Sequence, residues 1–183
     1  MSIRHLDALM SPRSIVVVGA SDRPGSSGAT VWRNLRTGAF EGPIHAVNPA
    51  HRTLDGERVF ARCADLAAAP DLAIVCTPSD QVAGVIRDLG RLGTRAAVVT
   101  TAGMGEAQRR AVRDAARPHL LRLLGPGSLG ILTPHLGLDA SLAPVGALPG
   151  VLAFVSQSNT LTTTVLDWAR SRAIGFSLSL IHI

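Results

Sequence analysis

The segment Ser14–Leu35, which reads SIVVVGASDRPGSSGATVWRNL, has the residue types of an anion-binding loop. A run of β-branched residues ends at Gly19, small and polar residues that include Arg23 follow, and a helix-like pattern begins near Gly28. Backbone N–H groups at a helix N-terminus, together with the helix dipole, attract phosphate groups. Glycines let the backbone come close to a ligand, and serine hydroxyls can donate hydrogen bonds to phosphate oxygens. The segment therefore predicts a phosphate site built from Gly19, Gly25, Gly28, Ser21, Ser26 and Ser27.

Three hypotheses compete for this loop: a nicotinamide dinucleotide, another phosphorylated ligand, or no ligand. The loop is longer than the G-x-G-x-x-G fingerprint of dinucleotide enzymes. The next strand-like run continues as AVNPAHRTLDG, without the acidic residue that holds the ribose of NAD. Asn48 and Pro49 form a turn there, and His51 and Arg52 follow. A cation at this place suits an additional phosphate on the ribose, which favours coenzyme A (CoA) or NADP over NAD. The alternative is that Arg52 is an exposed loop charge with no ligand.

These residues need a scaffold, and short apolar runs alternate with longer amphipathic ones along the chain. The expected strands are Ser14–Gly19, Pro43–Asn48, Asp71–Cys76, Arg95–Thr101, Leu120–Leu124 and Gly130–Leu132. The expected helices are HLDALM near the N-terminus, Gly28–Gly38, Ala64–Ala68, Ser79–Leu92 with Ser79 as its cap, and Gly105–Arg117. Strands that alternate with helices need crossover connections, so the sequence predicts a doubly wound α/β fold with a parallel sheet. The first strand-to-helix turn then lies at the carboxyl edge of the sheet, where ligands bind.

The pattern changes after Leu132. The segment TPHLGLDASLAPVGALPG is rich in Pro and Gly and is interpreted as a connector. A strand VLAFVS, a polar turn QSNT and a helix LTTTVLDWARSR follow it. One strand and one helix cannot bury their apolar faces alone, so we expect a first domain over residues 1–147 and the incomplete start of a second over residues 148–183.

The composition argues against several other classes of protein. Apolar residues make up 46% and charged residues 17% of the 183 residues, which is typical of a chain with a real core. All 18 basic residues are arginine and are spread along the chain, so the net charge of +5 does not indicate a nucleic-acid partner. Cys63 and Cys76 have no metal-ligand spacing, which predicts no metal and a reduced, cytoplasmic protein. No segment has the pattern of a signal peptide or a membrane span, so no membrane partner is expected.

Five segments occur in an order that is informative as a set. They are SIVVVGASDRPGSSGATVWRNLRTGAFEGPIHAVNP, PDLAIVCTPSD, AAVVTTAGMGE, LLGPGSLGILTP and LAFVSQSNTLTTTVLDWARSRAIGFS. This order resembles the NDP-forming acyl-CoA synthetases. That family includes the α part of succinyl-CoA synthetase, the ADP-forming acetyl-CoA synthetases, and Pat-type proteins that join a synthetase-like region to a GNAT acetyltransferase domain. The resemblance implies a Rossmann-like CoA-binding domain followed by the truncated start of a flavodoxin-like domain.

The resemblance also implies which residues contact CoA or acyl-CoA. The residues that would line the phosphate loop are Gly19, Ala20, Ser21, Arg23, Ser26, Ser27 and Gly28. Those expected beside the second strand are Asn48, Pro49 and Arg52, and those expected at the adenosine end are Thr77, Pro78 and Ser79. Further loops at the same edge, toward the thioester end, would be formed by Thr101, Ala102, Gly103, Gly125 and Pro126.

The resemblance implies a parent enzyme that uses ATP or ADP with Mg²⁺ outside this chain. Its partner would be the rest of the parent chain or a β-type subunit. Family members relay a phosphate through a histidine, and no histidine here matches that motif, so no catalytic residue is predicted. Two positions depart from the family pattern, because Gly127 replaces the Asn of GPNSLG and Asn159 replaces the Gly of SQSG. A stand-alone CoA-binding or sensor module and an NADP-linked oxidoreductase stay open as alternatives.

The family pattern breaks after IGFS, near the C-terminus of the chain. The last six residues, Leu178–Ile183, read LSLIHI and match one reading frame of a common sequencing adaptor. We therefore expect these residues to be non-native, and no function is assigned to them.

Overall fold

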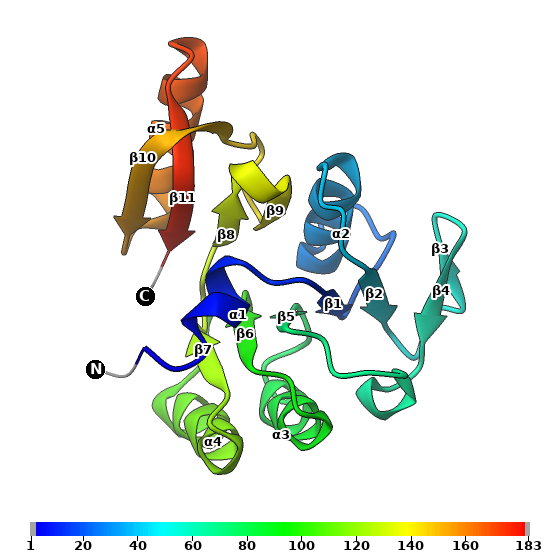
Figure 1. Ribbon diagram of the computed structural model, residues 1–183. Coiled ribbons are helices and arrows are strands. Elements are labelled where there is room, and N and C mark those ends of the chain that lie inside the picture. Colours follow the sequence, from blue (N-terminus) through cyan, green and yellow to red (C-terminus); the bar gives the residue numbers. More distant parts are fainter. Residues whose placement is uncertain (1–2, 182–183) are drawn as a thin grey trace.

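A seven-stranded sheet forms the centre of the first part of the chain. The computed structural model describes residues 3–181. The strands of this sheet are β1 (Ile15–Val18), β2 (Ile44–Val47), β3 (Thr53–Leu54), β4 (Glu57–Phe60), β5 (Leu72–Val75), β6 (Ala96–Val99) and β7 (Arg122–Leu124). Their order is β3-β4-β2-β1-β5-β6-β7, and every neighbouring pair except β3–β4 is parallel (Figure 1). The chain winds outward from β1 in both directions, which confirms the doubly wound α/β fold.

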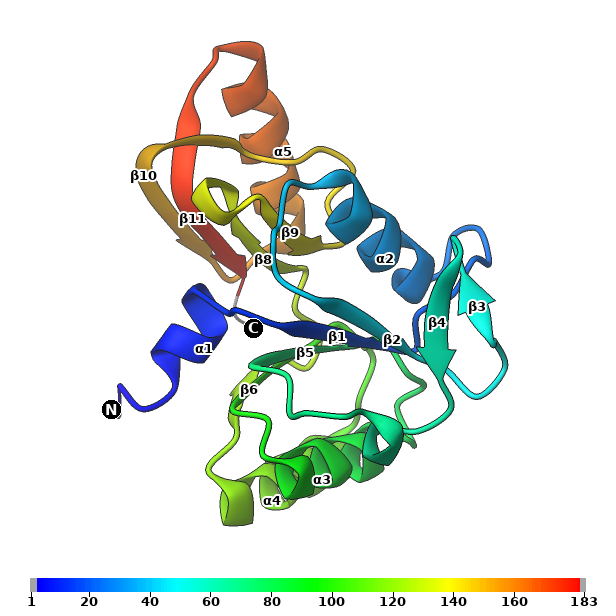
Figure 2. The ribbon, with the colours of Figure 1, turned by 45° about the vertical axis from the view of Figure 1, so that its right-hand side comes forward.

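Helices cover both faces of this sheet, as Figure 2 shows. They are α1 (Leu6–Met10), α2 (Ser27–Thr37), α3 (Val82–Leu92) and α4 (Glu106–Ala116). Alternate residues of β1 point to opposite faces, so Ile15 and Val17 pack with α1 and α2, whereas Val16 and Val18 pack with α3 and α4. All four side chains are fully or almost fully buried, as parallel strands between two helical layers require.

A smaller mixed sheet lies beside α2. Its strands are β8 (Gly130–Thr133), β9 (Leu138–Ser141), β10 (Leu148–Ser156) and β11 (Gly175–Ile181), in the order β10-β11-β8-β9, with helix α5 at Asn159–Ser171. Asn34 of α2 ties the two parts together, because its Nδ2 donates to the carbonyl oxygens of Ser141 at 2.9 Å and Ala143 at 3.0 Å. This sheet takes strands from both sides of residue 147, and the domain boundary there stays a prediction. Residues 178–181 belong to β11, whereas His182 and Ile183 lie outside the described residues.

Two of the segments predicted from the sequence differ in the structure. The helix expected over Ala64–Ala68 is wrong, since the structure has only a 3₁₀ turn, η1, at Cys63–Asp65. Asp65 folds back to accept the Arg62 backbone N–H at 3.0 Å, and the alanine run has no apolar stripe to extend the turn. The connector expected after Leu132 contains β9, the start of β10 and a 3₁₀ turn, η3, at Pro134–Leu136. A third 3₁₀ turn, η2, follows α4 at Arg117–His119.

The β3–β4 hairpin was not expected from the sequence. Asp55 and Gly56 form its two-residue turn with φ angles of 48° and 79°, as the Asp-Gly hairpin signature predicts. Leu54 is buried in the core, and the Asp55 carboxylate accepts the indole N–H of Trp32 in α2 at 2.8 Å. The hairpin therefore fixes the outer side of α2 and extends the sheet at one edge.

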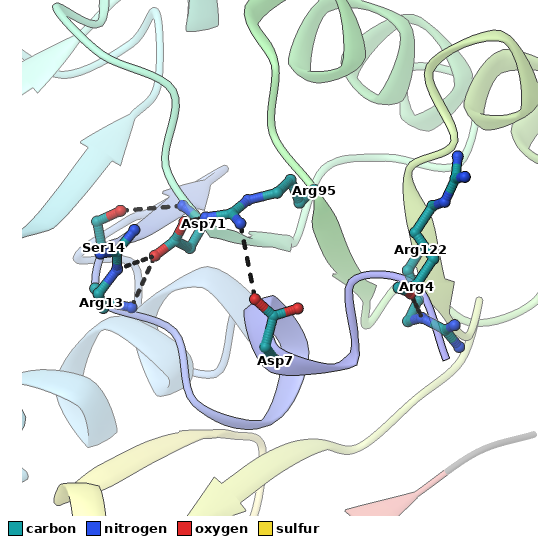
Figure 3. A network of polar contacts seen from close by, with 7 residues as sticks. All are labelled: Arg4, Asp7, Arg13, Ser14, Asp71, Arg95 and Arg122. Atoms are coloured by element: carbon teal, nitrogen blue, oxygen red, sulfur yellow. Dashed lines mark hydrogen bonds and ion pairs between the residues drawn. The ribbon is translucent and has the colours of Figure 1, made fainter. Parts of the chain in front are cut away.

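The carboxylate of Asp71 joins four elements at the amino edge of the sheet (Figure 3). It accepts the backbone N–H of Arg13 at 3.0 Å and a short hydrogen bond from Arg95, and its own N–H donates to Ser14 Oγ at 3.0 Å. Arg95 also reaches Asp7 of α1 at 3.7 Å. Burial on its own would raise the pKa of Asp71, but these hydrogen bonds and the arginine charges outweigh it and lower that pKa.

The Asp71→Asn variant should be less stable than the parent chain by about 2–3 kcal/mol at pH 7, because charged hydrogen bonds are lost. A carboxyl with a lowered folded pKa stabilises the fold above its unfolded pKa, and this contribution disappears as pH falls through the folded value. Urea unfolding as a function of pH checks this: the stability difference should be largest at pH 7 and should shrink progressively as pH falls below about 4, the pKa of an unperturbed aspartate. Asp114→Asn, which breaks an exposed pair with Arg110, is the control and should change stability by less than about 1 kcal/mol. A difference between the Asp71 chains that does not depend on pH would contradict the role of the charge.

Candidate functional site

A cleft of about 710 Å³ opens at the carboxyl ends of β1, β2 and β5. Strand order reverses between β1 and β5, and a doubly wound sheet leaves a crevice for ligands at such a point. The cleft is lined by Val18, Gly19, Ser21, Asp22, Arg23, Ser26, Gly28, Val47, Asn48, Pro49, Ala50, His51, Ala61, Arg62, Cys63, Cys76, Thr77, Pro78, Gln81, Val85 and Asp88.

The β1–α2 loop brings a helix N-terminus to the cleft. Gly19 has a φ of 88°, and a Cβ added to Gly28 would lie 1.9 Å from the Gly19 carbonyl oxygen. No side chain can occupy that space, so two glycines allow the first turn of α2 to rest directly on the end of β1. Ser26 caps the helix by accepting the Ala29 N–H at 3.2 Å. The N–H groups of Ser27 and Gly28 stand in the first turn, where the helix itself supplies no acceptor, and suit an anion.

Asn48 holds this loop against the end of β2. Its Nδ2 donates to the Ala20 carbonyl at 2.7 Å, and its Oδ1 accepts the Ala50 N–H at 2.9 Å. The Asn48 side chain therefore shapes the cleft wall through contacts within the protein. Arg52 lies just beyond this wall and does not line the cleft. Its backbone carbonyl accepts the Val59 N–H of β4 at 2.9 Å.

Thr77 lines the cleft just after β5, and its hydroxyl is buried. The residue is only 8% exposed, and among residues 3–181 its Oγ1 has no hydrogen-bond partner. A buried hydroxyl without a partner costs about 1–3 kcal/mol, so this one is suited to a ligand atom. The backbone carbonyl of Thr77 is already used, because it accepts the Thr101 hydroxyl at 2.7 Å.

The helix cap expected at Ser79 is wrong. Helix α3 begins at Val82, and its N-cap is Gln81, which makes no side-chain cap bond. Ser79 Oγ instead accepts a hydrogen bond from Gln108 Nε2 of α4 at 3.2 Å. The hydroxyl thus links the loop after β5 to helix α4, and Ser79 does not line the cleft.

Charges of both signs surround the cleft. His51 Nε2 lies 3.8 Å from the Asp22 carboxylate, and Arg62 pairs with Asp65 at 3.0 Å. The hydrogen bond from Arg62 is the main cause of the lowered pKa of Asp65. The Arg62 side chain is 78% exposed, so a ligand phosphate can compete for its guanidinium.

The two cysteines form part of the cleft surface. Burial raises the pKa of Cys63 and that of Cys76 to about 11 each, and the Cys76 thiol also accepts from the Thr100 hydroxyl at 3.4 Å. Both thiols are therefore neutral at physiological pH and act as apolar contacts instead of nucleophiles.

The sequence-predicted residues fall into two groups. The cleft brings together Gly19, Ser21, Arg23, Ser26, Gly28, Asn48, Pro49, Thr77 and Pro78. Those that do not line it are Ala20, Ser27, Arg52, Ser79, Thr101, Ala102, Gly103, Gly125 and Pro126; the last five follow β6 and β7 at the same sheet edge. The roles of both groups in ligand binding stay predictions.

Several cleft residues have no marker in the sequence. The segment Ala61–Cys63 reaches the cleft because β4 turns back beside β2, and the missed hairpin is what places it there. Val85 and Asp88 come from the expected α3 helix, and their spacing from Gln81 already puts them on one helix face. This spacing was the one signal in the sequence from which Val85 and Asp88 could have been predicted as cleft residues.

Comparison with known proteins identifies the family. The model of the family described as "CoA binding domain" matches residues 13–134, about two thirds of the chain. The chain belongs to this family of CoA-binding domains. The predicted kinship with NDP-forming acyl-CoA synthetases is confirmed, because the curated relatives of this CoA-binding chain include ADP-forming acetate–CoA ligases at about 30% identity.

The alignments with these relatives cover almost all of this chain but less than half of each relative. "Acetate–CoA ligase [ADP-forming] I" of Archaeoglobus fulgidus is 32% identical over 178 residues, which are 94% of this chain and 26% of the relative. The α subunit of the corresponding Pyrococcus furiosus ligase is 30% identical over 182 residues, 94% of this chain and 39% of the subunit. The solved acetyl-coenzyme A synthetase 1 of Ca. Korarchaeum cryptofilum, in complex with phosphate and ADP, has a TM-score of 0.92 and 33% identity over 97% of this chain and 39% of that one. This chain therefore spans about a quarter of the first curated relative.

The described part of the chain has neither a metal-binding cluster nor a membrane-spanning helix. Within residues 3–181 no three His, Cys, Asp or Glu side chains are grouped so that they could hold a metal ion. None of the helices in that range combines the length and the apolar character needed to cross a bilayer.

Gly28→Ala should destabilise the CoA-binding domain by about 1–3 kcal/mol, because the new methyl group overlaps the Gly19 carbonyl. Gly84→Ala is a matched control within helix α3, where a Cβ meets nothing within 4 Å. That change should be neutral or stabilise the fold by up to about 1 kcal/mol, because alanine favours a helix over glycine. Urea unfolding midpoints of the two variants give the comparison. Equal effects of the two substitutions would show that α2 does not need the close contact with β1.

Proposed function

We propose that this chain binds CoA or an acyl-CoA in the β1/β5 cleft. The observation that carries the proposal is Thr77, which lines the cleft and whose buried hydroxyl lacks a partner within residues 3–181. The N–H groups of Ser27 and Gly28 in the first turn of α2 would supply the phosphate end of such a site. The match to a family of CoA-binding domains over residues 13–134 supports the same ligand.

The charges around the cleft favour CoA over NAD. Asn48 stands at the end of β2, where NAD enzymes carry an acid, and its amide is already used to hold the phosphate loop. The cations that line the cleft are Arg23, Arg62 and, when protonated, His51. We infer that one of them binds the additional ribose phosphate of CoA, because Arg52, the residue expected for that role, lies outside the cleft.

We further propose that the chain is the N-terminal CoA-binding part of an ADP-forming acyl-CoA synthetase. Its relatives are named as acetate–CoA and 4-hydroxybutyrate–CoA ligases, and this chain covers only part of each. ATP or ADP with Mg²⁺ would then bind elsewhere in the parent protein, and a β-type subunit or the rest of the parent chain would be the partner. The second, smaller sheet would be the beginning of a flavodoxin-like domain. The relatives lend no support to the acetyltransferase branch.

The two departures from the synthetase pattern meet in the structure. Asn159 begins helix α5, and its Nδ2 donates to the Gly127 carbonyl oxygen at 3.4 Å. The amide absent at position 127 is therefore replaced by one that reaches the same loop from α5. This contact keeps the loop after β7 next to the turn before α5, and it therefore supports a synthetase-like parent protein.

Thr77→Val should weaken CoA binding about three- to tenfold, because one neutral hydrogen bond to the ligand is lost. The same change should leave the free energy of unfolding equal or higher, since it removes an unpartnered buried hydroxyl. Isothermal titration calorimetry measures the affinity and urea unfolding the stability.

Thr94→Val is the matched control for this experiment. Thr94 is 2% exposed, and its hydroxyl also has no hydrogen-bond partner in the described part of the chain, but the residue lies outside the cleft. Its substitution should change stability in the same direction and leave CoA affinity unchanged. Titration of the parent chain with NADP completes the design, and tight binding of NADP with no binding of CoA would overturn the proposed function.

A further inference from the structure

A second cleft lies between α2 and the smaller sheet, where α2 and β9 lie side by side (Figure 2). We call it the α2/β9 cleft, and its volume is about 780 Å³. Its walls include the last turns of α2, the start of β9, the loop between β9 and β10, and the last turn of α5. None of its lining residues also lines the β1/β5 cleft, so a ligand here is separate from one bound there.

Asp139 brings a partly buried carboxylate to the α2/β9 cleft. Its Oδ1 accepts a hydrogen bond from the Ser141 hydroxyl at 2.6 Å, and a Cβ added to Gly146 would lie 3.1 Å from its Oδ2. Burial raises the pKa of Asp139, although the hydrogen bonds from Ser141 act in the opposite direction. No arginine or histidine among residues 3–181 forms an ion pair with this carboxylate. A carboxylate that is shielded from water and has no cationic partner favours a positively charged group of a ligand.

Two arginines line the same cleft. Arg33 donates to Asn34 Oδ1 at 3.4 Å and Arg170 donates to the Gly146 carbonyl oxygen at 3.3 Å, and both distances are long for an N–H···O bond. Neither guanidinium forms an ion pair with a carboxylate in the part of the chain that the structure describes. Both residues are exposed, so their side chains can turn toward a ligand. Because a guanidinium can bind a carboxylate through two parallel hydrogen bonds, these arginines suit an anionic group.

Apolar side chains also line the α2/β9 cleft. Leu132 and Leu138 are buried, and Pro134 and Val145 are half-buried. They belong to the smaller sheet and to the segments that connect its strands. Removal of apolar surface from water is favourable, so these residues offer a contact for an apolar part of the ligand.

We propose that the α2/β9 cleft binds a free α-amino acid with an apolar side chain. Asp139 accepts hydrogen bonds from the ammonium group, and Arg33 and Arg170 donate to the carboxylate. The apolar side chain of the amino acid lies against Leu132 and Val145. A ligand with a single charge leaves the protein groups of the other kind unpaired, whereas an amino acid matches both. This inference goes beyond the proposed function and does not depend on it.

The test uses L-leucine and two analogues of the same carbon skeleton. One is 4-methylpentanoate, which lacks the ammonium group, and the other is 3-methylbutylamine, which lacks the carboxylate. Titrations of the 183-residue chain, followed by ¹H–¹⁵N chemical shifts, measure weak affinities and locate the ligand. L-Leucine should shift the amides of Asn34, Asp139 and Gly146. It should bind at least about tenfold more tightly than either analogue, because each analogue loses one charged interaction.

Substitutions of the charged residues should affect the three probes differently. Asp139→Asn should weaken binding of L-leucine about tenfold and leave that of 4-methylpentanoate equal or tighter, because this analogue has no ammonium group to pair. The amide oxygen of the new residue can still accept the Ser141 hydroxyl. Arg33→Gln and Arg170→Gln should each weaken L-leucine and 4-methylpentanoate about three- to tenfold and leave 3-methylbutylamine unchanged.

Two matched controls come from the same helices. Arg36 of α2 pairs with Glu57 at 3.0 Å, Asp167 is an exposed acid of α5, and neither residue lines the cleft. Arg36→Gln and Asp167→Asn should leave all three affinities at the parent values. Equal binding of L-leucine and 4-methylpentanoate by the parent chain would overturn the inference. The absence of shifts at the cleft amides with L-leucine at about 10 mM would also overturn it. Titration with CoA tests the proposed function separately.

Discussion

The contact between Gly28 and Gly19 is the constraint on which the rest of the site depends. Because neither residue has a side chain, the first turn of α2 rests on the residue that follows β1. Gly19 in turn approaches Cys76 and Thr77, which follow the neighbouring strand β5, and a Cβ on Gly19 would meet their backbone atoms at 3.0–3.2 Å. The phosphate loop and the Thr77 hydroxyl are thus held at a fixed distance from each other before any ligand arrives.

The two edges of the parallel sheet hold different kinds of polar group. At the amino edge, Asp71 is hydrogen-bonded by neighbouring elements, so its charge stabilises the fold. At the carboxyl edge, the Thr77 hydroxyl has no hydrogen-bond partner within residues 3–181, and the N–H groups of Ser27 and Gly28 lie in the first turn of α2. A folded protein tolerates few buried hydroxyls of this kind, and one in a residue that lines a cleft suits a binding site.

Local sequence patterns predicted the elements that are specified by residues close together in the sequence. The β1–α2 unit, the buried strands β5 and β6, and the two helices on the far face all follow from apolar periodicity and glycine placement. The β3–β4 hairpin could have been predicted from Asp55-Gly56, a signal that was overlooked. The alanine run after Cys63 has strong helix propensity, but no apolar stripe pins it to the sheet. In the segment after Leu132, β9 pairs with the preceding strand β8. The start of β10 pairs with β11, which lies about 27 residues further along the chain, and a local pattern does not carry that information. Resemblance supplied most of the site residues, and only the fold could show that Arg52 lies outside the cleft whereas Arg62 and Asp88 line it.

The location of the ligand is the central claim, and amide chemical-shift mapping tests it most directly. A two-dimensional ¹H–¹⁵N spectrum of the 183-residue chain is recorded during a titration with CoA. The structure predicts the largest shifts at the amides of Gly19, Ser27, Gly28 and Thr77, with smaller ones along α3. Shifts confined to a different cleft, which lies between α2 and β9 and is lined by Asn34 and Asp139, would place the ligand elsewhere and contradict the account.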